Sequence, residues 1–231
     1  MTTVGIIGGI GPESTIEYYR FIMEGYRRRH ADGGNPSIII NSIDLSKLIG
    51  CMNANNLDAV TDYLVSEIAR LERAGAHFVA LAANTPHIVF DQVRARVSLP
   101  MISIVEATRD RARDLNLHRP LLFGTRFTME GKFYSEVFAA AGINLVIPND
   151  AERALIHEKY MGELLNNIFL PETGDRLIAI VNQIKQRDGI DGLILGGTEL
   201  PLLLRDTEIE GVPFLDTTRI HVERIVEALL S

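Results

Sequence analysis

The sequence predicts an α/β protein in which mostly parallel sheets are flanked by helices. Short apolar runs alternate along the chain with segments whose apolar residues recur at helical spacing, which is typical of a doubly wound sheet. Two runs, 78–87 (FVALAANTPH) and 191–200 (DGLILGGTEL), begin as strands buried on both faces and end in small and hydroxyl residues. We expect ligands at these strand ends, because free helix amides and the helix dipole favour anions there.

A near-constant offset indicates two related halves. Gly8 in the run VGIIGG and Gly124 in the run LLFGT are 116 positions apart, and Ala83 and Gly197 are 114 apart. This favours two α/β units, each with its ligand edge facing the other. The alternative is chance similarity, since buried strands draw on few residue types. We place the first lobe at residues 1–117 plus 213–231 and the second at 118–212.

The elements of the first half follow from apolar pattern and turn residues. Thr85 before Pro86 has the form of an N-cap followed by proline at the first helical position, and Gly75 is expected to end a helix. The expected strands are 3–8, 37–43, the start of 78–87 and 101–104, and the expected helices are about 13–29, 55–74, 86–96 and 106–114.

The second half repeats this order after residue 118. Thr198 is expected to cap a helix as Thr85 does, Gly189 to end one, and Asp216 to cap the terminal helix. The expected strands are 121–124, 144–147, 191–196 and 212–215, with a loop at 125–128 and helices at 130–141, 151–168, 171 to about 189, and after 216.

Composition excludes several classes of protein. The net charge of −7 offers no basic surplus for neutralising phosphates, which argues against nonspecific nucleic-acid binding. No apolar stretch reaches membrane-spanning length, and the N-terminus runs into a strand without a charged leader, so we expect a cytoplasmic protein. The single cysteine, Cys51, excludes an intramolecular disulfide and a cysteine-rich metal site. The histidines lack metal-ligand spacing, so no metal is expected.

The loop after the first strand carries glycines without a complete nucleotide motif. Gly9-Ile10-Gly11 is followed by Ser14 where a dinucleotide fingerprint needs its third glycine, and no lysine precedes Ser14 as in a P-loop. Either the glycines let the backbone approach a small ligand, or they form a simple strand-to-helix turn.

Four motifs together identify a family resemblance. They are GIIGGIGPEST at 5–15, AANTPH at 82–87, GTRFTM at 124–129 and LGGTELP at 195–201. With these motifs in family order and spacing, the chain resembles the aspartate/glutamate racemase superfamily, most closely its aspartate racemase-like branch. The resemblance implies two lobes related by a pseudo-twofold axis, a ligand cleft between them, frequent homodimers, and racemisation of an acidic amino acid without pyridoxal phosphate or another cofactor.

The resemblance also shows what this chain lacks. In the family, two cysteines act as bases on opposite faces of the α-carbon, since a thiol pKa of about 8.5 can be lowered near helix N-termini. Ala83 and Gly197 stand at those two positions, and a methyl group and a hydrogen transfer no protons. The two-thiol mechanism is therefore excluded for this sequence. Cys51 lies outside both motifs and is expected to be a small buried apolar residue.

The resemblance carries substrate-binding roles over to residues that remain. They are Gly9, Ile10, Asn84, Thr85, Thr125 and Thr198, together with Lys47. Lys47 either takes the place of the family's cation for the distal carboxylate or is a surface lysine. No second cation is found around residues 165–167, which weakens an assignment to aspartate or glutamate.

Two side chains are candidates for a replacement base. His87 follows Pro86 in the first helical turn and either acts as a base or packs and caps. Glu199 is next to Thr198 and either takes a proton or serves as a helix-dipole partner.

Three functions are consistent with the sequence. The first is a cofactor-independent isomerase of the racemase family whose catalysis is atypical or reduced. The second is a lyase or decarboxylase of a small carboxylic acid, because Ala83 and Gly197 would leave open space in the cleft. The third is a noncatalytic amino-acid or carboxylate binder.

Overall fold

The computed structural model describes residues 2–30, 34–204 and 207–231. The chain forms two compact units, Met1–Ile104 with Thr218–Ser231 (unit 1) and Val105–Thr217 (unit 2). The division expected from the sequence lay at 117/118 and 212/213, so helix α5 (Ile104–Asp114) falls mainly in the other unit. One reason is a hydrogen bond between Thr108 of this helix and the buried Tyr134 of unit 2.

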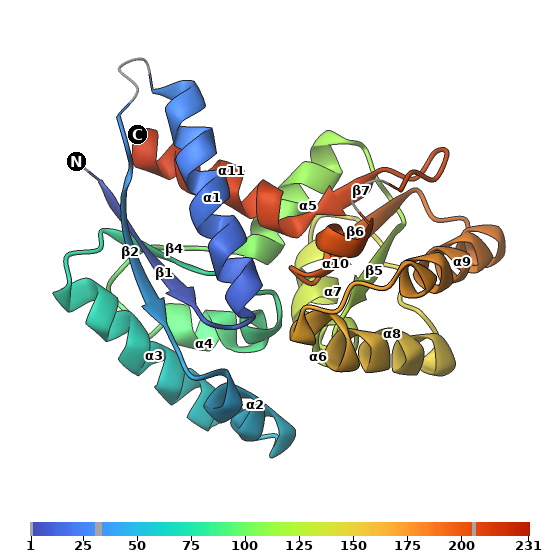
Figure 1. Ribbon diagram of the computed structural model, residues 1–231, viewed down its shortest axis with the longest axis horizontal. Helices are drawn as coiled ribbons and strands as arrows, with labels where there is room; N and C mark the ends of the chain where they lie inside the picture. Colours follow the sequence, from blue (N-terminus) through green and yellow to red (C-terminus); the bar gives the residue numbers. More distant parts are fainter. Residues whose placement is uncertain (1, 31–33, 205–206) are drawn as a thin grey trace. The chain divides into compact units, whose positions relative to one another are not determined.

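Unit 1 is built on a parallel sheet with the strand order β2-β1-β3-β4. Strands β1 and β3 are buried along their whole length. Their side chains on one face pack against α1 and α11, whereas Gly5 on the other face lies against Leu71 of α3. Figure 1 shows the ribbons of these helices beside the sheet. The strands are β1 (Thr3–Gly8), β2 (Ser37–Ser42), β3 (Phe78–Leu81) and β4 (Met101–Ile102). The helices are α1 (Pro12–Arg29), α2 (Leu45–Asn53), α3 (Leu57–Arg73), the 3-10 helix η1 (Thr85–Val89), α4 (Phe90–Arg94) and α11 (Thr217–Leu230).

Unit 2 contains a second parallel sheet, with the strand order β5-β6-β7. Its apolar core joins β5 and β6 to α8 and α9. The strands are β5 (Pro120–Gly124), β6 (Gly192–Gly196) and β7 (Phe214–Asp216). Besides α5, the helices are α6 (Arg126–Glu130), α7 (Lys132–Ala139), α8 (Asp150–Gly162), the 3-10 helix η2 (Leu164–Asn166), α9 (Pro171–Asp188) and α10 (Leu200–Leu204). The predicted fold class, parallel sheets flanked by helices, is confirmed.

Several predicted elements differ from the structure. The expected strand at 144–147 makes only one parallel bridge, between Leu121 and Val146. Residues 125–128, expected as a loop, include the start of α6, and α2 was not predicted at all. The Asp44 side chain explains α2, because it accepts hydrogen bonds from the Ser46 and Lys47 amides and so caps the helix. Helix α8 ends at Gly162 instead of 168.

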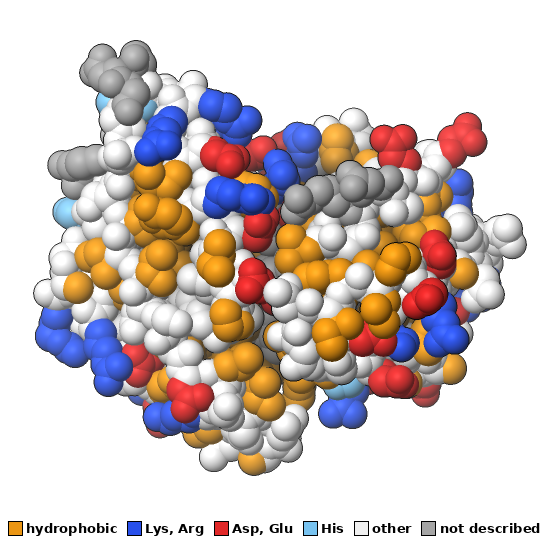
Figure 2. All heavy atoms as spheres, viewed as in Figure 1, with side chains coloured by type: hydrophobic (Ala, Val, Ile, Leu, Met, Phe, Trp, Pro, Cys, Tyr) orange, Lys and Arg blue, Asp and Glu red, His pale blue; other side chains and the backbone are white. Residues whose placement is uncertain are grey.

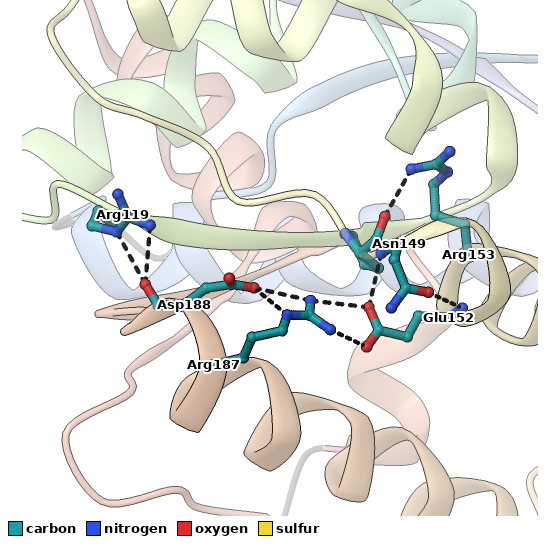
Figure 3. A network of polar contacts seen from close by, with 7 residues as sticks. Arg119, Asn149, Glu152, Arg153, Arg187 and Asp188 are labelled. Carbon is teal, nitrogen blue, oxygen red and sulfur yellow. Dashed lines mark hydrogen bonds and ion pairs between the residues drawn. The ribbon is translucent and has the colours of Figure 1, made fainter.

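The start of α8 is fixed by a polar network on the surface of unit 2 (Figure 3). Asn149 and Glu152 form a capping box, in which each side chain bonds the other residue's backbone N–H. Arg187 near the end of α9 donates to both Glu152 carboxylate oxygens, and the Asp188 carbonyl accepts from the Arg119 side chain. The network thus ties the end of α9 to the start of α8 and to the segment before β5.

The surface is mixed in character. Figure 2 shows acidic and basic side chains spread over one face with hydrophobic ones between them. Ile16 and Tyr19 on α1 and Ile40 on β2 are among the exposed large hydrophobic residues. Across the described part of the chain, no helix is both long enough and apolar enough to span a membrane.

Candidate functional site

In unit 1, the first two motifs meet at the carboxyl ends of β1 and β3. The Gly9 amide donates to the Thr15 hydroxyl at 2.9 Å, and the Ser14 hydroxyl donates to the Ala82 carbonyl at 2.8 Å. Gly9 has a φ of 79°, and a Cβ there would lie 2.6 Å from the Ile43 carbonyl oxygen, so only glycine fits this close approach. The loop that contains Gly9 and Ile10 is therefore fixed against the sheet edge, and Ile10 is buried.

The segment after β3 does not form the expected cap. The helix there is η1, a 3-10 turn that begins at Thr85 itself, and Asn84 in the N-cap position makes no side-chain cap hydrogen bond. Ala83 and Asn84 are buried and Thr85 is half-buried. Because η1 and α4 have five residues each, the helix dipole expected at this edge is small.

His87 is fully engaged by the backbone. Its Nε2 accepts from the Ile104 amide at 3.2 Å, so its Nδ1 carries the proton and donates to the Ala83 carbonyl at 3.0 Å. Burial, reinforced by the nearby His221, lowers the pKa of His87 to about 3. A neutral imidazole with both nitrogens bonded holds the strand end in place and has no lone pair to offer a substrate.

A second buried histidine lies beside it. The His221 ring centroid is 6.4 Å from that of His87. Its Nδ1 accepts from the Tyr18 hydroxyl at 2.8 Å, so its Nε2–H donates to the Ile102 carbonyl at 3.0 Å. Burial lowers the pKa of His221 to about 4. The sequence gives His221 no role of its own, whereas the fold places it beside His87 and Tyr18.

Lys47 lies on α2, just beyond the end of β2. It is exposed, and its ammonium nitrogen is 4.1 Å from the centroid of the Tyr63 ring. A cation–π contact of this kind holds the side chain while leaving the charge accessible to an anion. Cys51 on the same helix is partly exposed instead of buried as expected.

In unit 2, glycines and a threonine lie at the carboxyl ends of β5 and β6. Gly124 and Gly196 are direct partners in the β5–β6 ladder, and a Cβ on Gly124 would lie 2.6 Å from the Gly196 carbonyl oxygen. The buried Thr125 caps α6, since its hydroxyl oxygen accepts from the Thr128 amide at 3.3 Å. Thr125 therefore lies directly at the carboxyl end of β5.

The space beside Gly197 is filled by Tyr160 of α8. A Cβ atom added to Gly197 would lie 2.6 Å from the Tyr160 hydroxyl oxygen and 2.8 Å from its Cζ. Carbon atoms do not approach this closely without strain. A side chain at position 197 would therefore require Tyr160 to move from its observed position.

The Tyr160 hydroxyl donates a hydrogen bond to Glu199 Oε2. The Thr198 hydroxyl donates to the same oxygen at 3.0 Å. Because α10 begins at Leu200, Thr198 lies one residue before the N-cap position that was expected for it. Glu199 is 3% exposed and Tyr160 is 4% exposed. Burial raises the pKa of the Glu199 carboxyl, and burial together with the Glu199 charge raises the pKa of Tyr160 well above its usual value.

Tyr160 is the site residue that the sequence analysis missed. It lies on the same helical face as Ile156, and both belong to the apolar core of unit 2. In sequence, a tyrosine at this spacing is typical of a core residue. Only its contact with Gly197 and Glu199, from a different part of the chain, shows its polar role.

The described residues contain no group of three or more histidine, cysteine or acidic side chains that could hold a metal ion. The strand ends of unit 1 thus carry backbone turns, hydroxyl groups and buried histidines, and those of unit 2 carry hydroxyl groups and one buried carboxylate. Such sets bind small polar molecules and move protons.

Two α/β units, each with polar groups at the carboxyl ends of its parallel strands, define a class of small-molecule binding proteins and enzymes. Within this class, residues 7–225 match the model of the Asp/Glu/Hydantoin racemase family. The chain belongs to this family.

Known relatives agree with this membership along the whole chain. An aspartate racemase homologue from Pyrococcus horikoshii OT3 has 33% identity over 100% of both chains, with a TM-score of 0.85. The aspartate racemase of Picrophilus torridus is similar in fold, with 21% identity, coverage of 99% of this chain and 94% of that one, and a TM-score of 0.81. The broad specificity amino-acid racemase RacX of Bacillus subtilis (strain 168) has 21% identity over 99% of this chain and 98% of its own.

Proposed function

We propose that this chain is a cofactor-independent, racemase-like protein that acts on or binds an acidic amino acid or a similar small carboxylate, with atypical or reduced catalysis. One observation carries the proposal. The family motifs surround Ala83 and Gly197, the positions that the resemblance assigns to catalytic thiols, and neither residue has an ionisable group.

The binding residues in this proposal are those at the strand ends. In unit 1 they are the Gly9–Ile10 loop, Asn84 and Thr85, and in unit 2 they are Thr125 and Thr198. These groups offer amides and hydroxyls of the kind that hold a carboxylate. Lys47 supplies an exposed cation at the end of β2 and is proposed to pair with a second carboxylate.

The test is exchange of the α-proton in deuterated buffer, followed by NMR over a panel of amino acids and small carboxylic acids with metal-free protein. We expect exchange above a boiled control with at least one acidic compound, and the responding compound names the substrate class. Binding of a compound without exchange would replace the racemase proposal with a noncatalytic binder. Neither exchange nor binding of any carboxylate would overturn the proposal.

A lyase or decarboxylase of a small carboxylic acid is the second candidate. It is favoured by the difference between the two positions, because a titratable pair lies beside Gly197 whereas His87 beside Ala83 is held by the backbone. A decarboxylase needs to return only one proton to one face of the carbanion. Release of carbon dioxide from a malonate-type acid, absent from the boiled control, would establish this alternative.

We further propose that the protein works as a homodimer, as its family resemblance implies, and that it is cytoplasmic, as expected from its sequence. Sedimentation equilibrium of the purified chain measures the first point, and a mass of 25.6 kDa at micromolar concentration would contradict it.

A further inference from the structure

We propose that Tyr160, positioned by Glu199, is the group that exchanges a proton with the substrate in place of a side chain at position 197. The inference rests on the proposed function, since it needs a bound carbon acid. It assigns the proton transfer to two residues, one of which lies outside the family motifs noted in the sequence.

Tyr160 lies where a side chain at position 197 would be. The Tyr160 hydroxyl oxygen lies 2.6 Å from the point where a side chain at position 197 would begin. It reaches this point from α8, whereas Gly197 directly follows β6. The glycine therefore makes room for a titratable group from another element, at the end of the central strand of the sheet.

Glu199 is a buried carboxylate that bonds the Tyr160 hydroxyl. Glu199 is almost fully buried, and among the described residues no lysine or arginine forms an ion pair with it. Its Oε2 is held by two hydroxyl groups, those of Tyr160 and Thr198. A buried carboxylate held only by neutral donors is costly for a fold. Titratable groups in such surroundings cluster at functional sites.

Tyr160 and Glu199 together can take a proton from the substrate carbon and return it. The proton on the substrate α-carbon passes to the Tyr160 oxygen while the hydroxyl proton passes to Glu199 Oε2. The electron pair of the broken C–H bond stays on the substrate, Tyr160 remains neutral, and Glu199 becomes a carboxylic acid. The reverse step returns a proton to the carbon. Burial raises the pKa of Tyr160, so a free phenolate is disfavoured and the two transfers must be coupled.

The inference also predicts stereochemistry. Beside Ala83, both His87 ring nitrogens are bonded to the backbone, so proton exchange is expected on one face of the substrate carbon. The rate at which deuterium is incorporated into an amino acid should therefore exceed the rate at which the opposite enantiomer forms. A two-base racemase gives comparable rates for the two processes.

The experiment compares Tyr160→Phe, Glu199→Gln and Glu199→Asp with the full-length parent chain in the same deuterium-exchange assay. Tyr160→Phe keeps the ring and removes only the hydroxyl, and we expect the exchange rate to fall about 100-fold or more. Tyr134→Phe is the matched control, because Tyr134 is another fully buried tyrosine of unit 2 whose hydroxyl bonds Thr108. Melting followed by circular dichroism verifies that each variant is folded.

The Glu199 variants test positioning by pH dependence. In the parent chain, exchange should rise with pH as the Glu199 acid loses its proton, because only the carboxylate accepts one. Glu199→Gln should abolish this rise and slow exchange about 100-fold. Glu199→Asp should retain the rise. A purely structural role would lower all rates without changing the shape of the profile.

The outcomes separate this inference from the proposed function. If the parent chain exchanges protons and folded Tyr160→Phe exchanges equally fast, the inference is wrong and the proposed function stands. If the parent chain binds a carboxylate without any exchange, the inference is overturned and the protein is a binder. If the parent chain neither exchanges nor binds, both proposals fail together.

Discussion

The ends of β3 and β6 look alike in sequence and differ in chemistry. Each strand is fully buried, each has a small residue, Ala83 or Gly197, within two positions of its end, and each leads into a helix of five residues. After β3, the titratable side chain is His87, and both its polar atoms bond the backbone. After β6, it is Glu199, which is bonded by the side chains of Tyr160 and Thr198.

This difference teaches how burial separates structural from chemical roles. A ring nitrogen that bonds a backbone amide or carbonyl satisfies a buried backbone group. Because a backbone group does not titrate, the ring has no partner with which to exchange a proton. A carboxylate bonded to a phenol shares a proton between two titratable groups. The first arrangement stabilises the strand end, whereas the second keeps a proton available at some cost in stability.

The largest expected effect is a loss of stability in acid, which the two buried histidines near the end of β3 should cause. The folded-state pKa values of His87 and His221 are about 3 and about 4, below an ordinary value of about 6.5. Below pH 6.5 the unfolded chain therefore binds protons that the folded chain does not. Stability should fall as pH drops from 6.5 towards 4, by about 2 kcal/mol per histidine at pH 5.

Urea unfolding measured from pH 7.5 to pH 5 checks this slope. His221→Gln should reduce the slope by about half. His118→Gln, at an exposed histidine, is the control and should leave it unchanged. A pH-independent free energy of unfolding would show that neither buried ring resists protonation.

The next effect concerns the β6 end. Gly197→Cys places a Cβ against the Tyr160 ring and should lower the free energy of unfolding by about 3 kcal/mol. Restoring a thiol at this position is thus not a simple reversal. The same substitution in a Tyr160→Ala background should cost much less, because the clash is gone. Equal costs in the two backgrounds of this double-mutant cycle would contradict the contact.

A smaller effect should follow from Tyr18→Phe at the β3 end. The substitution removes the hydroxyl that donates to His221 Nδ1 and leaves a buried acceptor without this donor. We expect a loss of about 2 kcal/mol in unfolding free energy with the exchange rate unchanged. A fall in exchange as large as that of Tyr160→Phe would mean that the β3 end also takes part in the chemistry.

The smallest expected effect has the opposite sign. Burial raises the pKa of Glu199, so the folded chain loses stability as pH rises through that pKa. Glu199→Gln removes the buried charge and should stabilise the chain by about 1 kcal/mol at pH 8. Glu67→Gln is the matched comparison, because buried Glu67 pairs with Arg70 and Asn41, and it should destabilise. Denaturant unfolding at pH 8 distinguishes the two signs.

Local pattern was sufficient to predict the longer elements. In α9, Leu177, Ile180, Val181 and Ile184 are buried as the helical spacing predicted, and Gly189 ends the helix with a positive φ. The apolar pattern of the sequence did not predict the short elements. The five-residue helices after β3 and β6 carry too few residues for periodicity to show, and the Thr85 and Thr198 side chains make no expected cap.

The sequence by itself determined the parallel α/β class, the family, and the strand ends where the motifs gather, because these depend on residue order and local periodicity. Only the tertiary structure placed Tyr160 against Gly197 and Glu199, and Tyr18 against His221, 203 positions away. Helix periodicity identifies which face of a helix is buried. Which atoms that face meets depends on how the helix packs on its sheet, and that is fixed by the fit of the whole core.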